Sequence, residues 1–453
     1  MHPLLVKHVA YPLHERLKRK RTFPWLRELE RTQWLGADSL RDYQFRRLRS
    51  HLQWAYAHVP YYRALFDEHD LAPARIQSFD DFHRLPFLTR ELLRSRFEDL
   101  RATVRLPNVK RRSTGGSTGI PVTVEVDMER MGISEAARLR THRWFGLEPG
   151  AREVVLWGSP IELGRQDRIR QVRDWLLNSR LLTAFDMGEV ALADHARAIL
   201  QFQPRKMYGY ASAFFLLARY FQRERLLPPP ALRAIFTTAE PLFDFQREAI
   251  ASAFRCPVSV EYGSRDGGLV AMECPAGGLH IFSEGMYVEI ADADDAGRGE
   301  IVVSCLDSFA FPIIRYRTGD IGSLDSSPCP CGRALPKLRN VEGRRTDFLV
   351  TPDGRVLHAL SAIYIVRDLP MVREFRIIQH GIDRVEVQLV TDRPLTEADG
   401  DTVRRQFCGL LGPQVHLDLL QVPSLPRSPS GKFRYVESRV SESFLTELIR
   451  GGR

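Results

Sequence analysis

Between about residues 110 and 345, short β-rich runs alternate with amphipathic helical patterns, and this alternation constrains the fold more than any other feature. The runs are Val122–Val126, Val154–Trp157, Ile235–Thr238, Val258–Tyr262 and Ile301–Ser304. Strands separated by helices predict a largely parallel α/β architecture. A glycine-bearing turn at residues 295–299 predicts some antiparallel sheet as well.

The segments on either side have different patterns. Residues 1–100 show apolar positions at three- and four-residue spacing, which predicts a helical lead-in. Pro60 should end the helix that precedes it, and Thr89 is a candidate N-cap. After a polar segment at 342–347, the remaining chain has its own strand and helix signals. We therefore expect an N-terminal domain of mixed sheets and helices over 1–345 and a small C-terminal α/β domain over 346–453.

Charge and hydropathy limit the classes of function. The 453 residues include 65 basic and 56 acidic side chains, for a net charge of +9. A basic surface suits nucleic acid, an anionic membrane or a polyanionic substrate, but an arginine-rich proteome explains the excess equally simply. No nucleic-acid motif accompanies the charge. No run approaches the ~20 apolar residues that span a bilayer, and the first residues lack a signal-peptide core, so a cytoplasmic protein is expected.

A loop rich in glycine and hydroxyl groups is the first candidate for binding chemistry. Its residues are Ser113, Thr114, Gly115, Gly116, Ser117, Thr118 and Gly119. Glycines let backbone N–H groups approach phosphate oxygens, and the hydroxyls add donors. No lysine follows the last glycine, so this is not a Walker loop. A plain flexible turn is an equally good interpretation of the loop alone.

Two acidic motifs follow. In residues 261–268, Asp266 lies in a tight loop after a strand, where a carboxylate can hold Mg²⁺ on ATP phosphates. In residues 316–320, Asp320 at a predicted strand end can accept both ribose hydroxyls. The alternative for Asp266 is a turn-capping side chain, and for Asp320 a surface turn.

Two basic motifs come later in the chain. Arg344, after Gly343, offers a planar, permanently charged donor for a ribose or an α-phosphate. Lys432, after Gly431, can deliver a mobile positive charge to a developing phosphoryl anion. A solvated basic tail is the alternative for the second motif.

The order of these five motifs resembles that of the superfamily of acyl-CoA synthetases, peptide-synthetase adenylation domains and luciferases. The whole chain is more similar to phenylacetate–CoA ligase-like enzymes, including a branch found in capsule and exopolysaccharide biosynthesis loci. The segments that carry this likeness are residues 59–63, 85–89, 208–210, 237–242 and 329–333.

The resemblance implies a role for each motif. Ser113 to Gly119 would cradle the ATP phosphates, Asp266 would place Mg²⁺, and Lys432 would stabilise the adenylation transition state. The nucleotide would also contact Asp320, Arg344, Tyr262 and Gly263, and the acyl group would contact Tyr208, Gly209, Tyr210 and Ser212. Such enzymes rotate the C-terminal domain between adenylation and thioester formation.

Two departures from the family pattern concern the second half-reaction. Thr346 stands where an Asp or Lys hinge is usual, and residues 349–357 lack the glycine pattern that presents a loop to the CoA thiol. The expected function is therefore an ATP-dependent carboxylate ligase with CoA as the default acceptor. The alternatives are an acyl-adenylate former with a sugar, amine or carrier-protein acceptor, and a non-catalytic scaffold. The substrate would be a small carboxylic acid, with aromatic acids as candidates; the oligomeric state is open.

The cysteines suggest a metal site. Cys274 and His280 follow the Tyr-Gly loop, while Cys329 and Cys331 follow the ribose motif. Three thiolates and one imidazole would make a closed tetrahedral zinc site, which is structural rather than catalytic. Two unrelated loops with buried or free thiols are the alternative, because these spacings are uneven for zinc.

Overall fold

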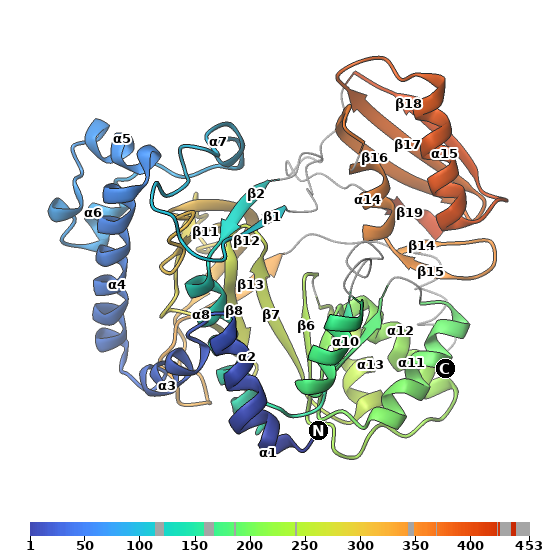
Figure 1. Ribbon diagram of the computed structural model, residues 1–453, viewed down its shortest axis with the longest axis horizontal. Coiled ribbons are helices and arrows are strands. Elements are labelled where there is room, and N and C mark those ends of the chain that lie inside the picture. The colour runs from blue at the N-terminus through green and yellow to red at the C-terminus, as the bar shows by residue number, and fades with distance from the viewer. Residues whose placement is uncertain are drawn as a thin grey trace.

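The computed structural model describes residues 1–113, 122–157, 167–184, 187–240, 242–342, 348–367, 369–423, 425 and 436–440. The predicted helical lead-in is confirmed (Figure 1, blue). Its helices are α1 (Pro3–Leu5), η1 (Val6–Ala10), α2 (Tyr11–Leu17), α3 (Thr22–Thr32), α4 (Ala37–His58), α5 (Pro60–Glu68), η2 (Pro73–Arg75), α6 (Phe79–His83) and α7 (Arg90–Ser95).

Both predicted helix boundaries in the lead-in are confirmed. α4 ends at His58, and Pro60 begins α5 because the missing N–H of proline costs nothing in the first turn of a helix. The Thr89 hydroxyl accepts a hydrogen bond from the backbone N–H of Leu92 at the start of α7. No described helix is long and apolar enough to cross a membrane.

An eleven-stranded sheet forms the centre of the large domain. Its strands lie in the order β10-β11-β12-β13-β9-β8-β7-β6-β5-β3-β4. Their bounds are β3 (Glu153–Trp157), β4 (Ser179–Thr183), β5 (Lys206–Gly209), β6 (Ala234–Thr238), β7 (Val258–Ser264), β8 (Gly268–Glu273), β9 (Leu279–Ile281), β10 (Met286–Ala291), β11 (Gly299–Cys305), β12 (Tyr316–Asp325) and β13 (Lys337–Glu342).

The expectation of a largely parallel sheet is wrong. Only the five strands β4, β3, β5, β6 and β7, which are neighbours in this order, run parallel. Every pairing on the other side of β7, as far as β10, is antiparallel. The predicted turn at 295–299 joins β10 to β11, as expected. The later strands are joined by hairpins and loops without helices, and such connections pair neighbours antiparallel.

Helices cover both faces of the parallel half. One face packs on α11 (Glu189–Phe202), α12 (Ala211–Arg223) and α13 (Asp244–Phe254), in a core that includes Leu156, Met207 and Ile235. α8 (Met128–Trp144) covers the other face, and α10 (Asp167–Leu176) precedes the edge strand β4. α8 is unusually polar on its buried side, because Arg130, Arg140 and His142 all lie in the protein interior.

Buried polar contacts attach the lead-in to the sheet. The Glu284 carboxylate accepts hydrogen bonds from the Thr32 hydroxyl at 2.7 Å and from Arg140 at 2.5 Å. The Gln44 amide donates to the carbonyls of Ser283 and Met286, both at 2.9 Å. Buried charges and amides remain only where they are paired, so these contacts define where α3 and α4 lie.

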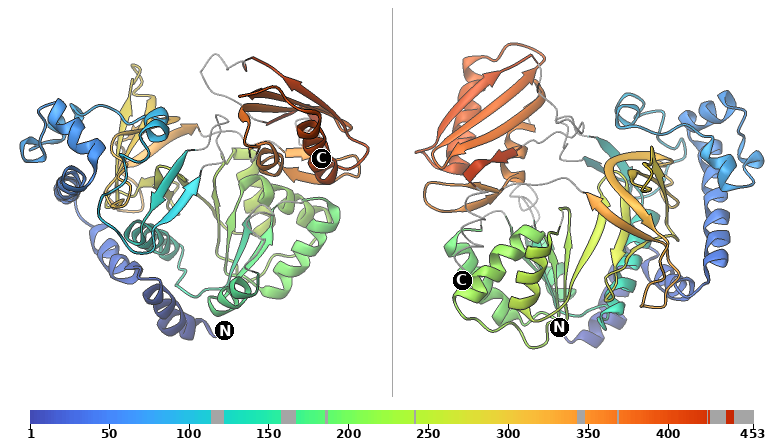
Figure 2. Two further views of the ribbon diagram at one scale, coloured as in Figure 1. Left: turned by 45° about the horizontal axis from the view of Figure 1, so that its top comes forward. Right: turned by 180° about the vertical axis from the view of Figure 1, so that it is seen from behind.

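The small C-terminal domain has its own core. Its elements are β14 (Phe348–Val350), β15 (Val356–His358), α14 (Leu360–Arg367), β16 (Val372–Gly381), β17 (Arg384–Thr391), α15 (Glu397–Leu411), β18 (His416–Gln421) and β19 (Val436–Ser438). The four-stranded sheet has the order β18-β17-β16-β19 and carries both helices (Figure 2, orange to red). Apolar residues such as Phe375, Val387 and Phe407 form the core between sheet and helices.

Candidate functional site

The carboxyl ends of the parallel strands meet at one edge of the sheet. Trp157 ends β3, Gly209 ends β5, Thr238 ends β6, and β7 leads into the loop around Asp266. In open α/β sheets, ligands bind outside this edge of the strands. Two of the predicted site segments, residues 208–212 and 262–266, therefore lie where the fold favours a ligand.

Ser113, the first residue of the predicted phosphate loop, is described by the structure. Ser113 is the last residue of β1 (Lys110–Ser113), which pairs antiparallel with β2 (Thr123–Val126). The Ser113 hydroxyl lies 3.0 Å from that of Thr123, and Arg265 donates to the Ser113 carbonyl at 3.3 Å. Thr114 to Gly119 lie outside the described residues. The start of this loop thus contacts the loop that carries Asp266.

The structure brings Tyr262 and Asp320 together. The Tyr262 hydroxyl donates to the Asp320 carboxylate at 2.9 Å, although 58 residues separate them in the chain. Asp320 lies within β12 and not at its end, so that detail of the prediction is wrong. The pairing of β12 with its neighbours is irregular around this point. The irregularity, together with the Gly319 backbone at φ +81°, interrupts the regular strand at Asp320.

Asp266 lies in the loop between β7 and β8, as predicted, but its carboxylate is buried. It accepts hydrogen bonds from the Tyr316 hydroxyl at 2.6 Å and from the Gly267 N–H at 3.1 Å. A guanidinium nitrogen of Arg90 lies 3.5 Å away. Arg130, from α8, donates to the Asp266 carbonyl at 2.8 Å. Three distant segments therefore hold this one loop.

Electrostatics keep the Asp266 carboxyl ionised. Burial acts to raise its pKa, but Arg90 and hydrogen bonds from Ser264 and Tyr316 outweigh burial, so the pKa lies below its ordinary value. The pKa of Tyr316 is raised, mainly by burial and then by the negative charge of Asp266. The pair is therefore an ionised carboxylate with a neutral phenol donor.

The residues predicted to contact the acyl group form an aromatic and polar wall. The Trp157 ring stacks on Tyr210 with centroids 4.4 Å apart, and more loosely on Tyr208 at 6.0 Å. The Ser212 hydroxyl and N–H both donate to Glu240, which follows β6. A side chain at Gly209 would meet the Leu156 carbonyl at 2.1 Å, so only glycine fits between these strands.

Sequence reasoning missed a partly buried ionic network that includes Tyr208. Arg138 forms two hydrogen bonds of 2.8 Å to the Glu261 carboxylate, which also accepts from the Tyr208 hydroxyl at 2.8 Å. Glu135 contacts Arg138 at 3.1 Å and accepts from the Tyr11 hydroxyl. The only available signal was an acidic residue directly before the Tyr-Gly pair. The arginine partner lies 123 residues earlier, and no local pattern identifies it.

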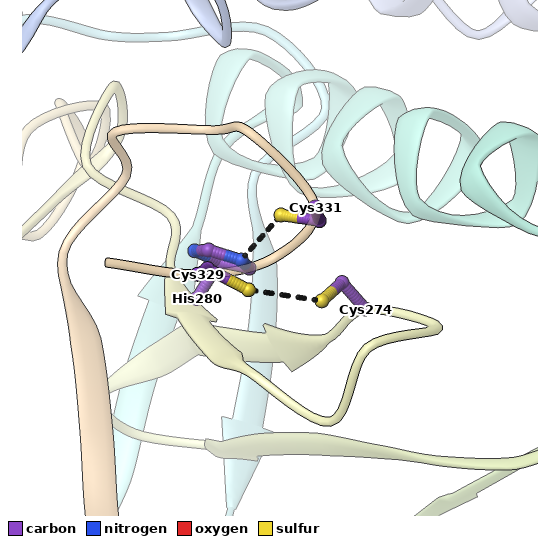
Figure 3. Close-up of side chains that lie close together, drawn as sticks. All are labelled: Cys274, His280, Cys329 and Cys331. Atoms are coloured by element: carbon purple, nitrogen blue, oxygen red, sulfur yellow. Dashed lines mark hydrogen bonds between the residues drawn. The ribbon is translucent and has the colours of Figure 1, made fainter. Parts of the chain in front are cut away.

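The four predicted metal ligands do converge (Figure 3). The Cys274 and Cys329 sulfurs are 3.6 Å apart, and His280 Nε2 lies 3.2 Å from the Cys331 sulfur. All four candidate ligand atoms lie within 4.8 Å of one another. Metal–sulfur bonds of about 2.3 Å and metal–nitrogen bonds of about 2.0 Å require separations of this size. The cluster could hold a metal ion.

Neighbouring groups orient the cluster. His280 lies in β9, and its Nδ1 is 2.9 Å from the Leu335 carbonyl. That contact leaves Nε2 directed at the thiols, the arrangement that metal-binding histidines usually show. A Cβ atom at Gly278 would lie 2.8 Å from the Cys329 sulfur, so the close approach of the two loops requires glycine there.

Burial lowers the pKa of His280, which favours the neutral imidazole that a metal needs. Burial has the opposite effect on a thiol and raises the pKa of Cys274 to about 12.

The other two predicted site residues, Arg344 and Lys432, lie outside the described residues. Their roles stay predictions. The described part of the candidate site is thus the carboxyl edge of the parallel strands, the Tyr262–Asp320 contact, the Asp266 loop and, on the antiparallel side, the metal cluster.

Several solved structures with this fold show one ligase in different states. The structure of 2-hydroxyisobutyryl-CoA ligase with 2-HIB-AMP and CoA in the thioesterification state has a TM-score of 0.63 and 20% identity, covering 93% of this chain and 94% of that one. The post-adenylation state of the same ligase with R3-HIB-AMP has a TM-score of 0.59 and 19% identity, with the same coverage. The large mixed-sheet domain and small C-terminal sheet domain are shared with that ligase.

Sequence comparisons agree with the fold. Residues 349–439 match the family model of the CapK C-terminal domain. Protein CapK of Staphylococcus aureus is 22% identical over 431 residues, 94% of each chain. Phenylacetate-coenzyme A ligase of Thermus thermophilus is 23% identical over 439 residues, covering 89% of this chain and 97% of that protein.

The chain is phenylacetate–CoA ligase-like and has the fold of the adenylate-forming superfamily. The phenylacetate-coenzyme A ligase of Pseudomonas putida is similar as well, with 26% identity over 370 residues, 78% of this chain and 82% of that protein. The resemblance inferred from the five motifs is thus confirmed.

Replacing Asp266 with Asn should destabilise the large domain in a pH-dependent way. The folded-state pKa of Asp266 is depressed, so its charge stabilises the fold above the unfolded pKa of about 3.9, and this contribution disappears as the pH falls through the folded value. We expect a loss of roughly 2 kcal/mol at neutral pH, because the Arg90 guanidinium loses the negative charge that faces it. The difference from the native protein should vanish in acid.

Urea unfolding of both proteins from neutral to acidic pH measures this difference. Asp70→Asn is the matched control, since Asp70 forms an exposed ion pair with Arg75 and should contribute little. A stability loss for Asp266→Asn that is the same at every pH would contradict the ionised pair.

Proposed function

We propose that the protein is an ATP-dependent carboxylate ligase that forms an acyl-adenylate and then transfers the acyl group, by default to CoA. The observation that carries the proposal is the convergence of Tyr262, Asp320 and the Asp266 loop at the carboxyl edge of the parallel strands. The whole-chain similarity to phenylacetate-coenzyme A ligases supports the same chemistry.

In this proposal the nucleotide lies over the end of β7. Asp320 accepts hydrogen bonds from the ribose, Tyr262 and Gly263 line the adenine and acyl sites, and Ser113 to Gly119 surround the phosphates through backbone N–H groups. Tyr262 already donates to Asp320 at 2.9 Å, which leaves further lone pairs on that carboxylate for the ribose hydroxyls. Arg344 assists at the ribose or α-phosphate.

Mg²⁺ would arrive bound to ATP, and Asp266 is the proposed protein ligand. Carboxylates together with phosphate oxygens are the ligands that Mg²⁺ prefers. In the described structure the carboxylate points to Tyr316 and Arg90. Metal contact therefore requires Asp266 to exchange its Arg90 ion pair for the ion, and Arg90 would then be released toward the phosphates.

The acyl substrate would contact the wall formed by Trp157, Tyr208, Gly209, Tyr210 and Ser212. The stacked Trp157–Tyr210 pair supplies aromatic rings, while the Ser212–Glu240 contact adds polar groups beside them. An aromatic or other hydrophobic carboxylic acid fits such a wall. The proposal of an aromatic or hydrophobic acid rests both on these side chains and on the similarity to phenylacetate-coenzyme A ligases.

The acceptor is the less constrained half of the proposal. CoA follows from the ligase relatives, whereas similarity to Protein CapK and the CapK C-terminal domain family favours the polysaccharide-associated branch. A sugar, amine or carrier-protein acceptor is therefore the second candidate. Free CoA should accelerate AMP release only if CoA is the acceptor. A scaffold without catalysis is the third candidate, and it predicts no adenylation at all.

We further propose that Cys274, His280, Cys329 and Cys331 bind one structural Zn²⁺. Three sulfurs and one nitrogen fill a tetrahedral shell and leave no position for a substrate. The ion would tie the loop between β12 and β13 to the β8–β9 hairpin, next to the pairing of Lys337 with His280. It would stabilise the antiparallel half of the sheet.

Lys432→Ala tests the catalytic proposal. Loss of a positive charge that acts only on the transition state should lower acid-dependent pyrophosphate release by a hundredfold or more, by rough analogy with other electrostatic catalytic groups. The circular dichroism spectrum should not change. Lys7→Ala is the control, since Lys7 pairs with Glu148 at the surface. Unchanged release in Lys432→Ala would contradict the assignment.

Asp320→Ala separates nucleotide binding from acid selection. Removing the ribose acceptor should raise the KM for ATP by about tenfold or more, because hydrogen bonds to charged groups contribute 1.5–3 kcal/mol. The ranking of carboxylic acids should stay the same. Asp292→Ala, which removes an exposed partner of Arg317, is the control. A changed acid ranking with an unchanged KM for ATP would contradict the ribose role.

Cys329→Ser tests the metal. The purified native protein should contain about one zinc per chain, and the variant should lose it and unfold at a lower temperature. Metal content measured by mass spectrometry and a thermal melt give both quantities. Cys408→Ser, at an exposed free cysteine, should keep the metal. Equal zinc content in both variants would exclude the proposed site.

A further inference from the structure

The N-terminal helical segment exposes a row of apolar side chains. Leu5, Val9, Leu13 and Leu17 recur every fourth residue and are 47%, 52%, 54% and 75% exposed, and Leu4 beside them is 59% exposed. Residues four apart share one face of a helix. Val6, between Leu5 and Val9 in the chain, is fully buried. We call the five exposed residues the N-terminal ridge.

A second apolar face lies close to the ridge. Val172, Trp175 and Leu176 on α10 are 58%, 63% and 37% exposed. α10 lies beside the start of the chain (Figure 1), and the Met1 ammonium donates to Asn178, just after α10, at 2.8 Å. Together the two segments hold eight of the 17 large apolar side chains that are exposed in the described chain. Such a concentration marks an interaction surface.

The surface around the ridge is cationic. Residues 1–21 contain six Lys or Arg side chains and one acid, Glu15, which is buried and paired with Lys20. Arg16, Lys18 and Arg19 are exposed at the end of α2. None of these three forms an ion pair with another residue in the described ranges. They are therefore available to an external anion.

Other cations reinforce this charge. Partial burial lowers the pKa of Lys18, and the nearby positive charges of Lys20, Arg173 and Lys110 lower it further. Residues from the N-terminal segment, α10 and β1 therefore contribute to one positive field. Placing like charges together costs free energy, and an anionic surface would relieve that cost.

We propose that the N-terminal ridge and its flanking cations bind the surface of an anionic lipid bilayer. An amphipathic helix with leucines on one face and Lys or Arg beside them lies in the membrane interface, with its apolar face buried among the headgroups. Each nearby Lys or Arg adds attraction to anionic lipid. The exposed Trp175 is of the residue type that is enriched at this depth.

Charge also selects the membrane over a second copy of the chain. A two-fold interface places the patch against the same patch of a second copy, so two surfaces of the same positive charge would face each other, and the one acid of residues 1–21, Glu15, is buried and paired with Lys20. Five adjacent leucine and valine side chains suit acyl chains rather than phosphodiesters. The binding is peripheral and consistent with the absence of a spanning helix among the described residues.

Flotation of the full chain with lipid vesicles tests the proposal. Vesicles of phosphatidylcholine alone are compared with vesicles that also contain phosphatidylglycerol, at low and high salt. We expect the protein to float with the anionic vesicles, and less so at high salt because of screening. Binding to neither vesicle type, or equal binding to both, would overturn the proposal.

Two triple variants assign the contacts. Leu5→Ser/Val9→Ser/Leu13→Ser and Arg16→Gln/Lys18→Gln/Arg19→Gln should each reduce vesicle binding by more than about tenfold. The matched controls are Val190→Ser/Leu227→Ser, at sites 79% and 67% exposed elsewhere on the molecule, and Arg404→Gln/Arg405→Gln on α15. The controls should bind as the native protein does.

Melting temperatures of all four variants, which should equal that of the native protein, exclude unfolding as the cause. Vesicle binding that survives either triple variant would overturn the proposal, as would an equal loss in the controls. Sedimentation velocity provides a further comparison. A concentration-dependent dimer that the ridge variant abolishes, without vesicle binding, would assign the ridge to a second copy and refute the membrane role.

Discussion

The site depends on strand β7, which pairs parallel with β6 on one edge and antiparallel with β8 on the other. Glu261 and Tyr262 are adjacent on this strand, and alternation directs them to opposite faces of the sheet. Glu261 is held by Arg138 on the side covered by α8, while Tyr262 reaches Asp320 on β12. One strand thus links Glu261 and Arg138 in the parallel half to Asp320 in the antiparallel half.

The Asp266 loop continues directly from β7 and takes its shape from partners far away in the chain. Arg90 comes from the helical lead-in, Arg130 from α8 and Tyr316 from β12. A buried carboxylate is stable only when charges and donors of this kind surround it. The lead-in therefore does more than cover the sheet, since without Arg90 the loop would carry an unpaired buried charge.

Local signals predicted much of the fold. β-branched runs located β3, β6, β7 and β11 to within two residues, and the caps at Pro60 and Thr89 were correct because capping depends on neighbours in the chain. The direction of the strands was predicted less well. Periodicity identifies a strand but carries no information about its partner, so the antiparallel half was mistaken for part of a parallel sheet.

The same distinction applies to the site. Asp266, Tyr262 and Asp320 belong to compact motifs that a local pattern can select, and Cys274, His280, Cys329 and Cys331 could be grouped because thiols and imidazoles are rare enough to be paired by type. Arg90 and Arg138 were missed. The chain has 65 basic residues, so the role of a single arginine can be inferred only from the carboxylate that it contacts in the fold.

The central claim is that this fold activates a carboxylic acid with ATP. The most direct measurement is isotope exchange between pyrophosphate and ATP across a panel of carboxylic acids without any acceptor, because exchange requires a reversible acyl-adenylate step. Exchange that depends on a subset of the acids, hydrophobic ones foremost, is the predicted result. Absence of exchange with every acid, from protein that is folded and binds ATP, would contradict the claim and favour a scaffold that has kept only the fold.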